Sequence, residues 1–393
     1  MRALVGTTPI PPFDPFGLPA PAWVFELLML VTMLLHVLFM NLALGGAWLA
    51  TLLDLLTLVR RGNHNHTVRV IWQAMPVALS FTITTGVAPL LFVQVLFGQF
   101  FYTATVFMGF TWFALVPLLI VGFYLVYVLV YRLSSLLTRQ LGRWDRAPGK
   151  RLLLSLLCAV LFAAVAWVLT NNHMLSIQPD RWAQRGTWLQ NRFGVTPATT
   201  HPRFAHNVAG AIAVAGLWLA GIGWWRRWRQ ADPPEIATLI TKTGLWTFLH
   251  MVVLAAIFGV VLFFMLPQEV SRRLLSPSVY TVLWWVGLLG VVGQLMFGVL
   301  ALQQPTRFKW FAGLSACAIV TLVGMVAVRE AVRLAYLARA GIDMPRIWQH
   351  VNPQDSSLTL FAVMLVVALG TVTWLLWISV KARPYPGAGE TRP

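Results

Sequence analysis

Nine long apolar stretches constrain this chain more than any other feature of its sequence. A bilayer core requires about 20 apolar residues in each crossing helix, and the chain of 393 residues is 58% hydrophobic, 10% charged and has a mean hydropathy of +0.73. Such a composition excludes a soluble domain. The sequence therefore predicts an all-α, polytopic membrane helical bundle in a single domain, residues 1–393. The expected spans lie near residues 22–58, 71–101, 104–131, 152–174, 204–225, 239–266, 279–302, 309–337 and 358–380.

The distribution of basic residues predicts the orientation in the membrane, because cytoplasmic loops carry an excess of Lys and Arg. The loops after odd-numbered spans and the C-terminal tail hold eighteen of these residues, whereas the opposite face holds nine. We therefore expect the N-terminus outside and the C-terminus in the cytoplasm. The net charge of +17 is spread over short loops, so we expect contact with the lipid bilayer rather than with nucleic acid.

Four ionisable residues lie in or at the mouths of the apolar stretches, where such groups are costly and usually mark function. Counted at 1.5 Å per residue, all four lie about 30 Å from the cytoplasmic boundary, although they are far apart in the sequence. They are His36, His173, His206 and Glu330. The sequence therefore predicts a chemical site near the outer leaflet. In contrast, His250 is expected near the middle of the membrane, and His64 and His66 in a solvated cytoplasmic loop.

Imidazoles from separate helices, inside an envelope of Trp, Phe and Leu, are typical of haem sites in helical bundles. Zinc or copper would want three or four converging ligands, and the sequence alone leaves this alternative open. Cys158 and Cys317 fall inside expected spans, and the chain has no C-x-x-C-H motif. A haem in this protein is therefore expected to be bound non-covalently.

Five motifs follow one another along the chain: LLHVLFMNLALGGAWLA (Leu34 to Ala50), FTITTGVAPLLFVQ (Phe81 to Gln94), NNHMLSIQP (Asn171 to Pro179), HPRFAHNVAGAIAVAG (His201 to Gly216) and VAVREAVRLAYL (Val326 to Leu337). Their order and residues resemble those of subunit I of the cytochrome bd oxidases, along most of the chain. Nine helices with an external N-terminus also agree with that family.

The resemblance implies roles for individual residues. It implies that His36 binds the oxygen-reactive haem, that His206 binds the low-spin haem b, and that Glu330 serves the high-spin haem b with Arg333 three residues later. His36, Glu330 and Arg333 are thus the expected catalytic residues, and up to three haems, of b type with d type as a further option, are the expected cofactors. The sixth ligand of the haem at His206 is expected to be His173, with His201 or His350 as alternatives.

The chain departs from the family at the parts that serve quinol and protons. The link from Pro267 to Ser278 is too short for the extracellular quinol-binding loop. Thr111 and Leu119 stand where the family has two glutamates that serve the proton path. Trp284 stands where a Met ligand is expected, and Met296 lies deeper in the span. We therefore expect a membrane electron-transfer subunit that exchanges electrons with a periplasmic or membrane-anchored c-type cytochrome rather than with quinol. Other membrane subunits of a respiratory complex, in a bacterial inner membrane, are the expected partners.

Two other functions fit the same sequence. One is a bd-type terminal oxidase that reduces oxygen and binds quinol elsewhere, and the other is a cofactor-free transporter or structural membrane subunit. In the second case the intramembrane histidines are hydrogen-bonding core residues, and Glu330 and Arg333 form a structural ion pair.

Overall fold

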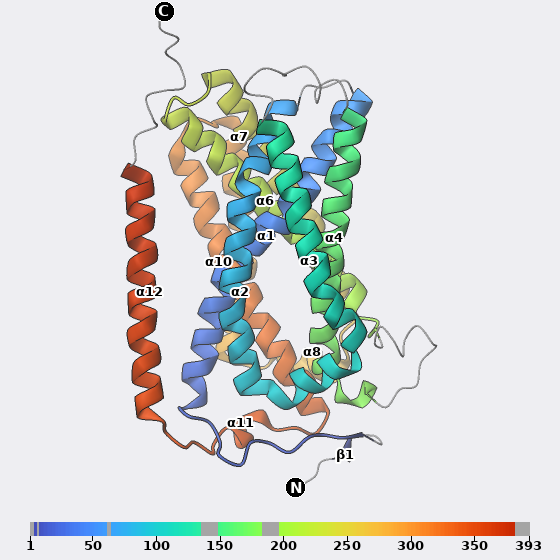
Figure 1. Ribbon diagram of the computed structural model, residues 1–393. Coiled ribbons are helices and arrows are strands. Elements are labelled where there is room, and N and C mark those ends of the chain that lie inside the picture. The colour runs from blue at the N-terminus through green and yellow to red at the C-terminus, as the bar shows by residue number, and fades with distance from the viewer. Residues whose placement is uncertain (1–3, 6–7, 61–63, 135–147, 183–195, 382–393) are drawn as a thin grey trace, which may run out of the picture. The chain divides into compact units, whose positions relative to one another are not determined.

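The computed structural model describes residues 4–5, 8–60, 64–134, 148–182 and 196–381, which are almost entirely helical (Figure 1). A short antiparallel pair of strands precedes the helices. The elements are β1 (Leu4–Val5), β2 (Thr8–Pro9), α1 (Ala22–Arg60), α2 (Asn65–Phe107), α3 (Gly109–Ser134), α4 (Pro148–Ser176), η2 (Pro179–Arg181), α6 (Thr200–Trp228), α7 (Pro234–Phe264), α8 (Gln268–Leu275), α9 (Val279–Gln303), α10 (Phe308–Arg339), α11 (Met344–Ile347) and α12 (Asp355–Lys381).

Eight of the described helices are long and apolar enough to cross a bilayer, which confirms the expected polytopic bundle. They are α1, α2, α3, α4, α6, α7, α9 and α10. The ninth expected span coincides with α12, whose described apolar part, Asp355–Thr371, is shorter than the other eight. That crossing therefore stays a prediction, as does the orientation of the termini.

The chain divides into two compact units, which we describe separately. The first comprises Met1–Pro12 and Phe25–Met344, and the second Phe13–Val24 and Pro345–Pro393. In the second unit, His350 Nε2 lies 3.2 Å from the carbonyl oxygen of Pro15. This contact joins His350 to the segment Phe13–Val24 of the same unit. The organisation as a single domain stays a prediction.

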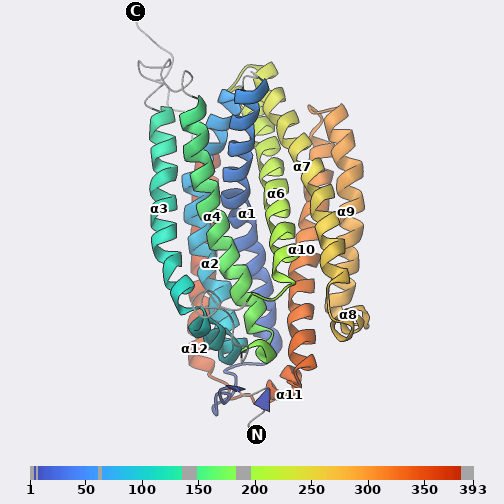
Figure 2. The ribbon, with the colours of Figure 1, turned by 90° about the vertical axis from the view of Figure 1, so that its right-hand side faces the viewer.

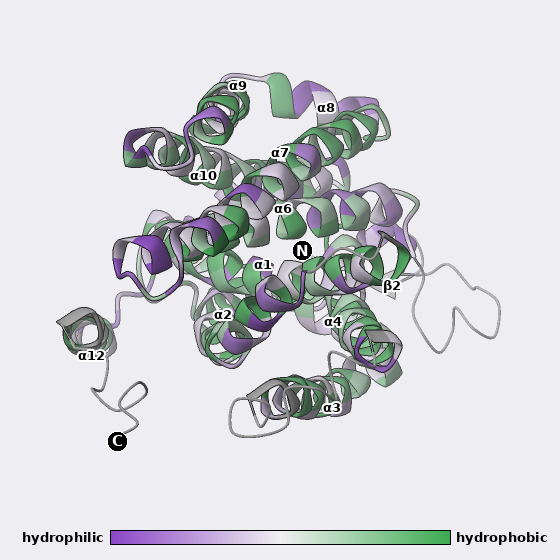
Figure 3. Cartoon of the chain, turned by 90° about the horizontal axis from the view of Figure 1, so that it is seen from above, coloured by the Kyte–Doolittle hydropathy of each residue, from purple (hydrophilic) through white to green (hydrophobic). Residues whose placement is uncertain are grey.

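Glycines allow the helices of the first unit to pack closely. A Cβ atom at Gly216 in α6 would lie 2.7 Å from the carbonyl oxygen of Gly244 in α7, and one at Gly287 in α9 would lie 2.9 Å from Cα of Gly324 in α10. Small residues at such crossings are the usual basis of close packing between membrane helices. In the view along the bundle, α1 and α6 lie near its middle and α3 and α9 at opposite edges (Figure 3).

Helix α2 is longer than the second expected span and is kinked near its end. Phe97 has non-helical φ and ψ of −133° and 26°, the helix then continues to Phe107, and only Met108 separates it from α3. The expected gap at residues 102–103 is therefore wrong: the chain stays helical there and turns at Phe97 instead (Figure 1). The kink places the ring of Phe97 beneath Arg333, with the guanidinium carbon 4.4 Å from the ring centroid.

The short link between α7 and α9 is a helix rather than an irregular loop. Val270 and Leu274 of α8 are buried, and they pack in a cluster with Val332 and Tyr336 of α10. Helix α8 lies towards the end of the bundle at which α10 ends (Figure 2). Apolar packing thus fixes α8 against the end of α10.

Candidate functional site

Four predicted site residues lie near one end of the bundle. Each is 22 to 25 residues from the opposite end of its helix, which corresponds to about 33 to 38 Å. Because α1 and α6 end where α4 and α10 begin (Figure 2), these distances are measured from the same end. The residues are His36, His173, His206 and Glu330.

His36 is half-buried and bonded to the backbone of a neighbouring helix. Its Nδ1 lies 3.0 Å from the carbonyl oxygen of Thr82 in α2. Since a carbonyl only accepts, Nδ1 carries the proton and Nε2 keeps its lone pair. A Cβ atom at Gly86 would lie 2.9 Å from Cε1 of the ring, so the glycine provides the space in which the imidazole lies.

His206 repeats this arrangement on other helices. Its Nδ1 lies 2.8 Å from the carbonyl oxygen of Ala255 in α7, and a Cβ atom at Gly259 would lie 3.3 Å from that nitrogen. In both sites the glycine stands four residues after the carbonyl. A helical Cβ points towards the N-terminus and would crowd the previous turn, so glycine leaves the carbonyl open to the imidazole. A hydrogen bond from one ring nitrogen that frees the other is usual for ligating histidines.

Glu330 is almost fully buried between two arginines of its own helix. Its Oε1 accepts a hydrogen bond of 3.0 Å from Arg329 Nη1, and its Oε2 lies 2.8 Å from Arg333 Nη1 without the alignment of a hydrogen bond. Arg333 is also buried and directs Nη1 towards the sulfur of Met29, at 3.6 Å. The carboxylate thus has two charged neighbours, but its Oε2 accepts no hydrogen bond within the described residues.

His173 lies among arginines. Its Nε2 is buried and forms no hydrogen bond with the described part of the chain, and the same is true of Nε of the buried Arg203. Arg203, Arg329 and Arg333 all act electrostatically on His173. Within the described residues, Glu330 is the carboxylate that pairs with this group. The region therefore holds more buried positive than negative charge.

The arginines also connect the histidines to one another. Arg329 acts electrostatically on His36 as well as on His173, and Arg203 acts on His206. The structure thus brings the four predicted residues into one electrostatic neighbourhood at one end of the bundle. Their roles as haem ligands stay predictions.

Glu26 and Tyr280 form a pair in this region that sequence reasoning missed. The hydroxyl of Tyr280 in α9 donates a hydrogen bond of 2.7 Å to Oε1 of Glu26 in α1, and Glu26 lies within electrostatic range of Glu330. The pairing joins residues 254 positions apart. A signal was present, since Glu26 is an ionisable residue inside the first apolar stretch.

Several other residues considered from the sequence lie away from this cluster. His250 is exposed and bonds the carbonyl of Trp246 in its own helix at 2.7 Å, as expected for a non-ligand, and the exposed Met296 is a poor candidate for a buried ligand. The expected loop position of His66 is wrong: it lies in the first turn of α2, and its Nε2 is 3.3 Å from Asp232 Oδ2. His64 is the N-cap of the same helix.

Two pockets at the surface of the first unit are built from other residues. One, of about 970 Å³, is a mostly apolar groove along α2 and α3 lined by three tyrosines, among them Tyr124 and Tyr127. The other, of about 440 Å³, lies between α8 and the end of α10. Neither is lined by His36, His206 or Glu330, so neither belongs to the predicted site.

The fold is similar to that of a solved respiratory enzyme. One chain of the bd oxidase from Geobacillus thermodenitrificans matches with a TM-score of 0.68 and 14% sequence identity, over 93% of this chain and 99% of that chain. No protein-family model and no curated protein match the sequence. The fold that the motifs predicted is confirmed, and the chain is a polytopic membrane protein with the fold of a bd oxidase chain.

Proposed function

We propose that the chain is a haem-binding electron-transfer subunit of a bd-oxidase-like respiratory complex. The observation that carries this proposal is the buried Arg203 beside His173: its Nε forms no hydrogen bond and it has no carboxylate partner within the described residues, because Glu330 pairs with Arg329 and Arg333. An uncompensated buried charge costs several kcal/mol. An anionic ligand offsets that cost, and the propionate groups of haem are such a ligand.

The side chains of the site fit haem better than a bare metal ion. Within the described residues, no three His, Cys, Asp or Glu side chains cluster as a bare ion requires. A haem brings its own equatorial nitrogens and needs only axial ligands. His36 and His206 would serve as these ligands through Nε2, with Glu330 and Arg333 at a further haem. Bound haem supplies one-electron redox chemistry.

The surrounding residues would hold these ligands in place. The carbonyls of Thr82 and Ala255 fix the tautomer and the direction of each imidazole. Arg329 holds one oxygen of Glu330 by a hydrogen bond. Arg203 and Arg329 would pair with acidic groups of the macrocycle, and His173, whose Nε2 is available, is the proposed sixth ligand at His206.

We further propose a c-type cytochrome as the electron donor at the outer face, with entry at His206. The support is that the connection between α7 and α9 consists only of α8 and two short linkers. It is therefore too short for the long loop that would bind quinol. Other membrane subunits and a bacterial inner membrane, with the N-terminus outside, complete this proposal. Oxygen uptake with reduced cytochrome c, compared with uptake on quinol, tests it. Faster uptake on quinol would instead favour a bd-type terminal oxidase with a quinol site elsewhere.

A pyridine haemochrome spectrum of the purified protein tests haem binding itself. We expect His36→Ala and His206→Ala each to remove part of the haem absorbance, because each variant deletes one axial nitrogen. His250→Ala is the matched control, since His250 is exposed and bonded within its own helix. A protein without haem, or unchanged spectra in both variants, would contradict the proposal and favour a cofactor-free membrane subunit.

A further inference from the structure

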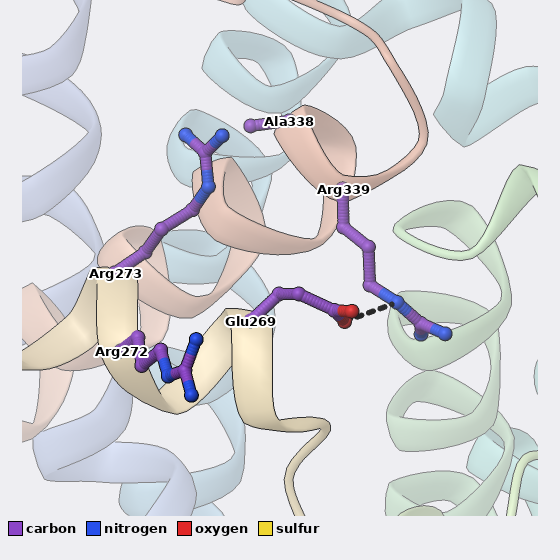
Figure 4. Close-up of a pocket in the computed structure, with 5 residues that line it drawn as sticks. All are labelled: Glu269, Arg272, Arg273, Ala338 and Arg339. Carbon is purple, nitrogen blue, oxygen red and sulfur yellow. Dashed lines mark ion pairs between the residues drawn. The ribbon is translucent and has the colours of Figure 1, made fainter.

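A pocket of about 440 Å³ between α8 and the end of α10 is rich in arginine. It is lined by Glu269, Arg272, Arg273, Ala338 and Arg339 (Figure 4). Arg339 Nε lies 3.0 Å from Glu269 Oε2, so one carboxylate orients one guanidinium. Among the described residues, no carboxylate pairs with Arg272 or Arg273. The pocket thus has two positive charges in excess.

The packing of α8 holds these charges in a fixed place. Val270 and Leu274 are buried against Tyr336 of α10, while Arg272 and Arg273 are exposed on the other side of the short helix. Ala338 contributes only a methyl group to the wall, which leaves space among the guanidinium groups. Guanidinium groups match the oxygens of phosphate in charge and in geometry.

Exposed apolar side chains lie at the ends of the two helices that α8 connects. Phe264 ends α7 and is 79% exposed, and Val279 and Val282 in the first turn of α9 are 75% and 61% exposed. Both helices are long and apolar enough to span a bilayer, so exposed apolar side chains at their ends can contact acyl chains. Charge for a phosphate lies on α8, and apolar side chains for hydrocarbon lie on the helix ends that precede and follow it.

We propose that this pocket binds the phosphate of an anionic phospholipid, whose acyl chains lie along Phe264, Val279 and Val282. Basic pockets between membrane helices bind anionic head groups through their phosphates. Free phosphate has no hydrocarbon that could contact these apolar side chains. The space admits a head group rather than a protein surface, which argues against an acidic protein as the occupant.

The test is binding of phosphatidylglycerol to the purified full-length chain, measured by native mass spectrometry. Phosphatidylcholine and inorganic phosphate are parallel probes. Removing two charges in Arg272→Gln/Arg273→Gln should weaken phosphatidylglycerol binding roughly thirtyfold. Arg307→Gln/Lys309→Gln removes two exposed charges at the other end of α10 and should leave binding unchanged.

A second variant separates a pocket from diffuse attraction. Ala338→Leu keeps every charge but fills the space, and we expect it to weaken binding severalfold. If the double variant without lipid unfolds at a lower temperature than the wild type, its weaker binding could result from poor folding. The binding of Ala338→Leu then tests the proposal. Equal binding by the double variant and the control, or by Ala338→Leu and the wild type, would overturn the proposal. Equal affinity for phosphatidylcholine or for inorganic phosphate would overturn the assignment to an anionic lipid.

Discussion

Two buried clusters of charge at opposite ends of the bundle show different balances. At one end, Arg151 Nε donates to Asp54 Oδ1 at 2.7 Å, Ser155 donates to Oδ2 at 2.9 Å, and Arg151 Nη2 donates to Asn65 at 2.7 Å. One cation meets one anion there, and both carboxylate oxygens are bonded. At the other end, Arg329 and Arg333 pair with Glu330, and the buried Arg203 forms no ion pair within the described residues.

The difference separates a structural network from a candidate binding site. A buried network whose members are all satisfied rigidifies the core, whereas a partly satisfied one is costly in a medium of low dielectric constant. The cluster around Asp54 joins α1, α2 and α4, pairs one cation with one anion and gives each carboxylate oxygen a hydrogen bond. The cluster around His173 leaves His173 Nε2 and Arg203 Nε without a hydrogen bond within the described residues, and the haem that we propose there would supply an anion.

The largest effect is expected where the charges balance. Arg151→Met leaves Asp54 buried without its cation and should lower the free energy of unfolding by about 3–5 kcal/mol. Chemical unfolding in detergent measures this loss. The double variant Asp54→Leu/Arg151→Met removes both charges and should recover most of it. A loss of less than about 1 kcal/mol in the single variant would mean that the two clusters do not differ as proposed.

The same type of substitution should have the opposite sign at the other end. Arg203→Met removes one charge from the excess, so the haem-free protein should be as stable as the wild type or more stable. The haem-loaded variant should lose its cofactor about tenfold more readily, since a charge-assisted hydrogen bond contributes about 1.5–3 kcal/mol. Haem release to apomyoglobin measures the second quantity. If the haem-free variant is destabilised as strongly as Arg151→Met, Arg203 is a structural partner and not an anion site.

The two histidine sites differ in how tightly glycine encloses the ring. A new methyl group at Gly86 would lie 2.9 Å from the His36 ring, but one at Gly259 would lie 3.3 Å from His206. Gly86→Ala should therefore cost about 1–3 kcal/mol of stability and shift the spectrum of the haem at His36. Gly259→Ala should cost less. Gly210→Ala is the control, because nothing lies within 4 Å of a Cβ atom there; equal effects at Gly86 and Gly210 would contradict the enclosure.

Much of this fold was predictable because the bilayer imposes helix length and depth. The apolar stretches predict the eight spans, and counting residues from their ends places His36 and Glu330 at one level, as in the structure. The boundaries were less predictable. A single apolar pattern does not reveal that α2 turns at Phe97, or that a twelve-residue link folds as α8.

The partners of individual residues depend on packing between distant segments and were not predictable. Asp54 and Arg151 are 97 positions apart, and Glu26 and Tyr280 are 254 apart. Hydropathy gives the depth of a residue but not the direction in which its side chain points. The sequence therefore predicted the residues of the candidate site, whereas the arginines around them were found only in the structure.

The smallest effect is expected for an ion pair at the surface of the bundle. Asp232 lies in the turn between α6 and α7, where the side chain of Arg226 donates hydrogen bonds that lower the pKa of its carboxyl group, with a further contribution from His66. The folded pKa is thus below the unfolded value of about 3.9. Its contribution to stability is complete above that value and is lost as the pH falls through the folded pKa.

Unfolding measured between about pH 6 and pH 3 should show this loss in the wild type but not in Asp232→Asn. A pair at the surface with a partly exposed arginine contributes only about 0–1 kcal/mol, far less than Asp54 and Arg151, although both pairs are formed by an arginine and an aspartate. If Asp232→Asn destabilised the protein as much as Arg151→Met, burial would not be the property that distinguishes these pairs, and the contrast between the two ends of the bundle would lose its physical basis.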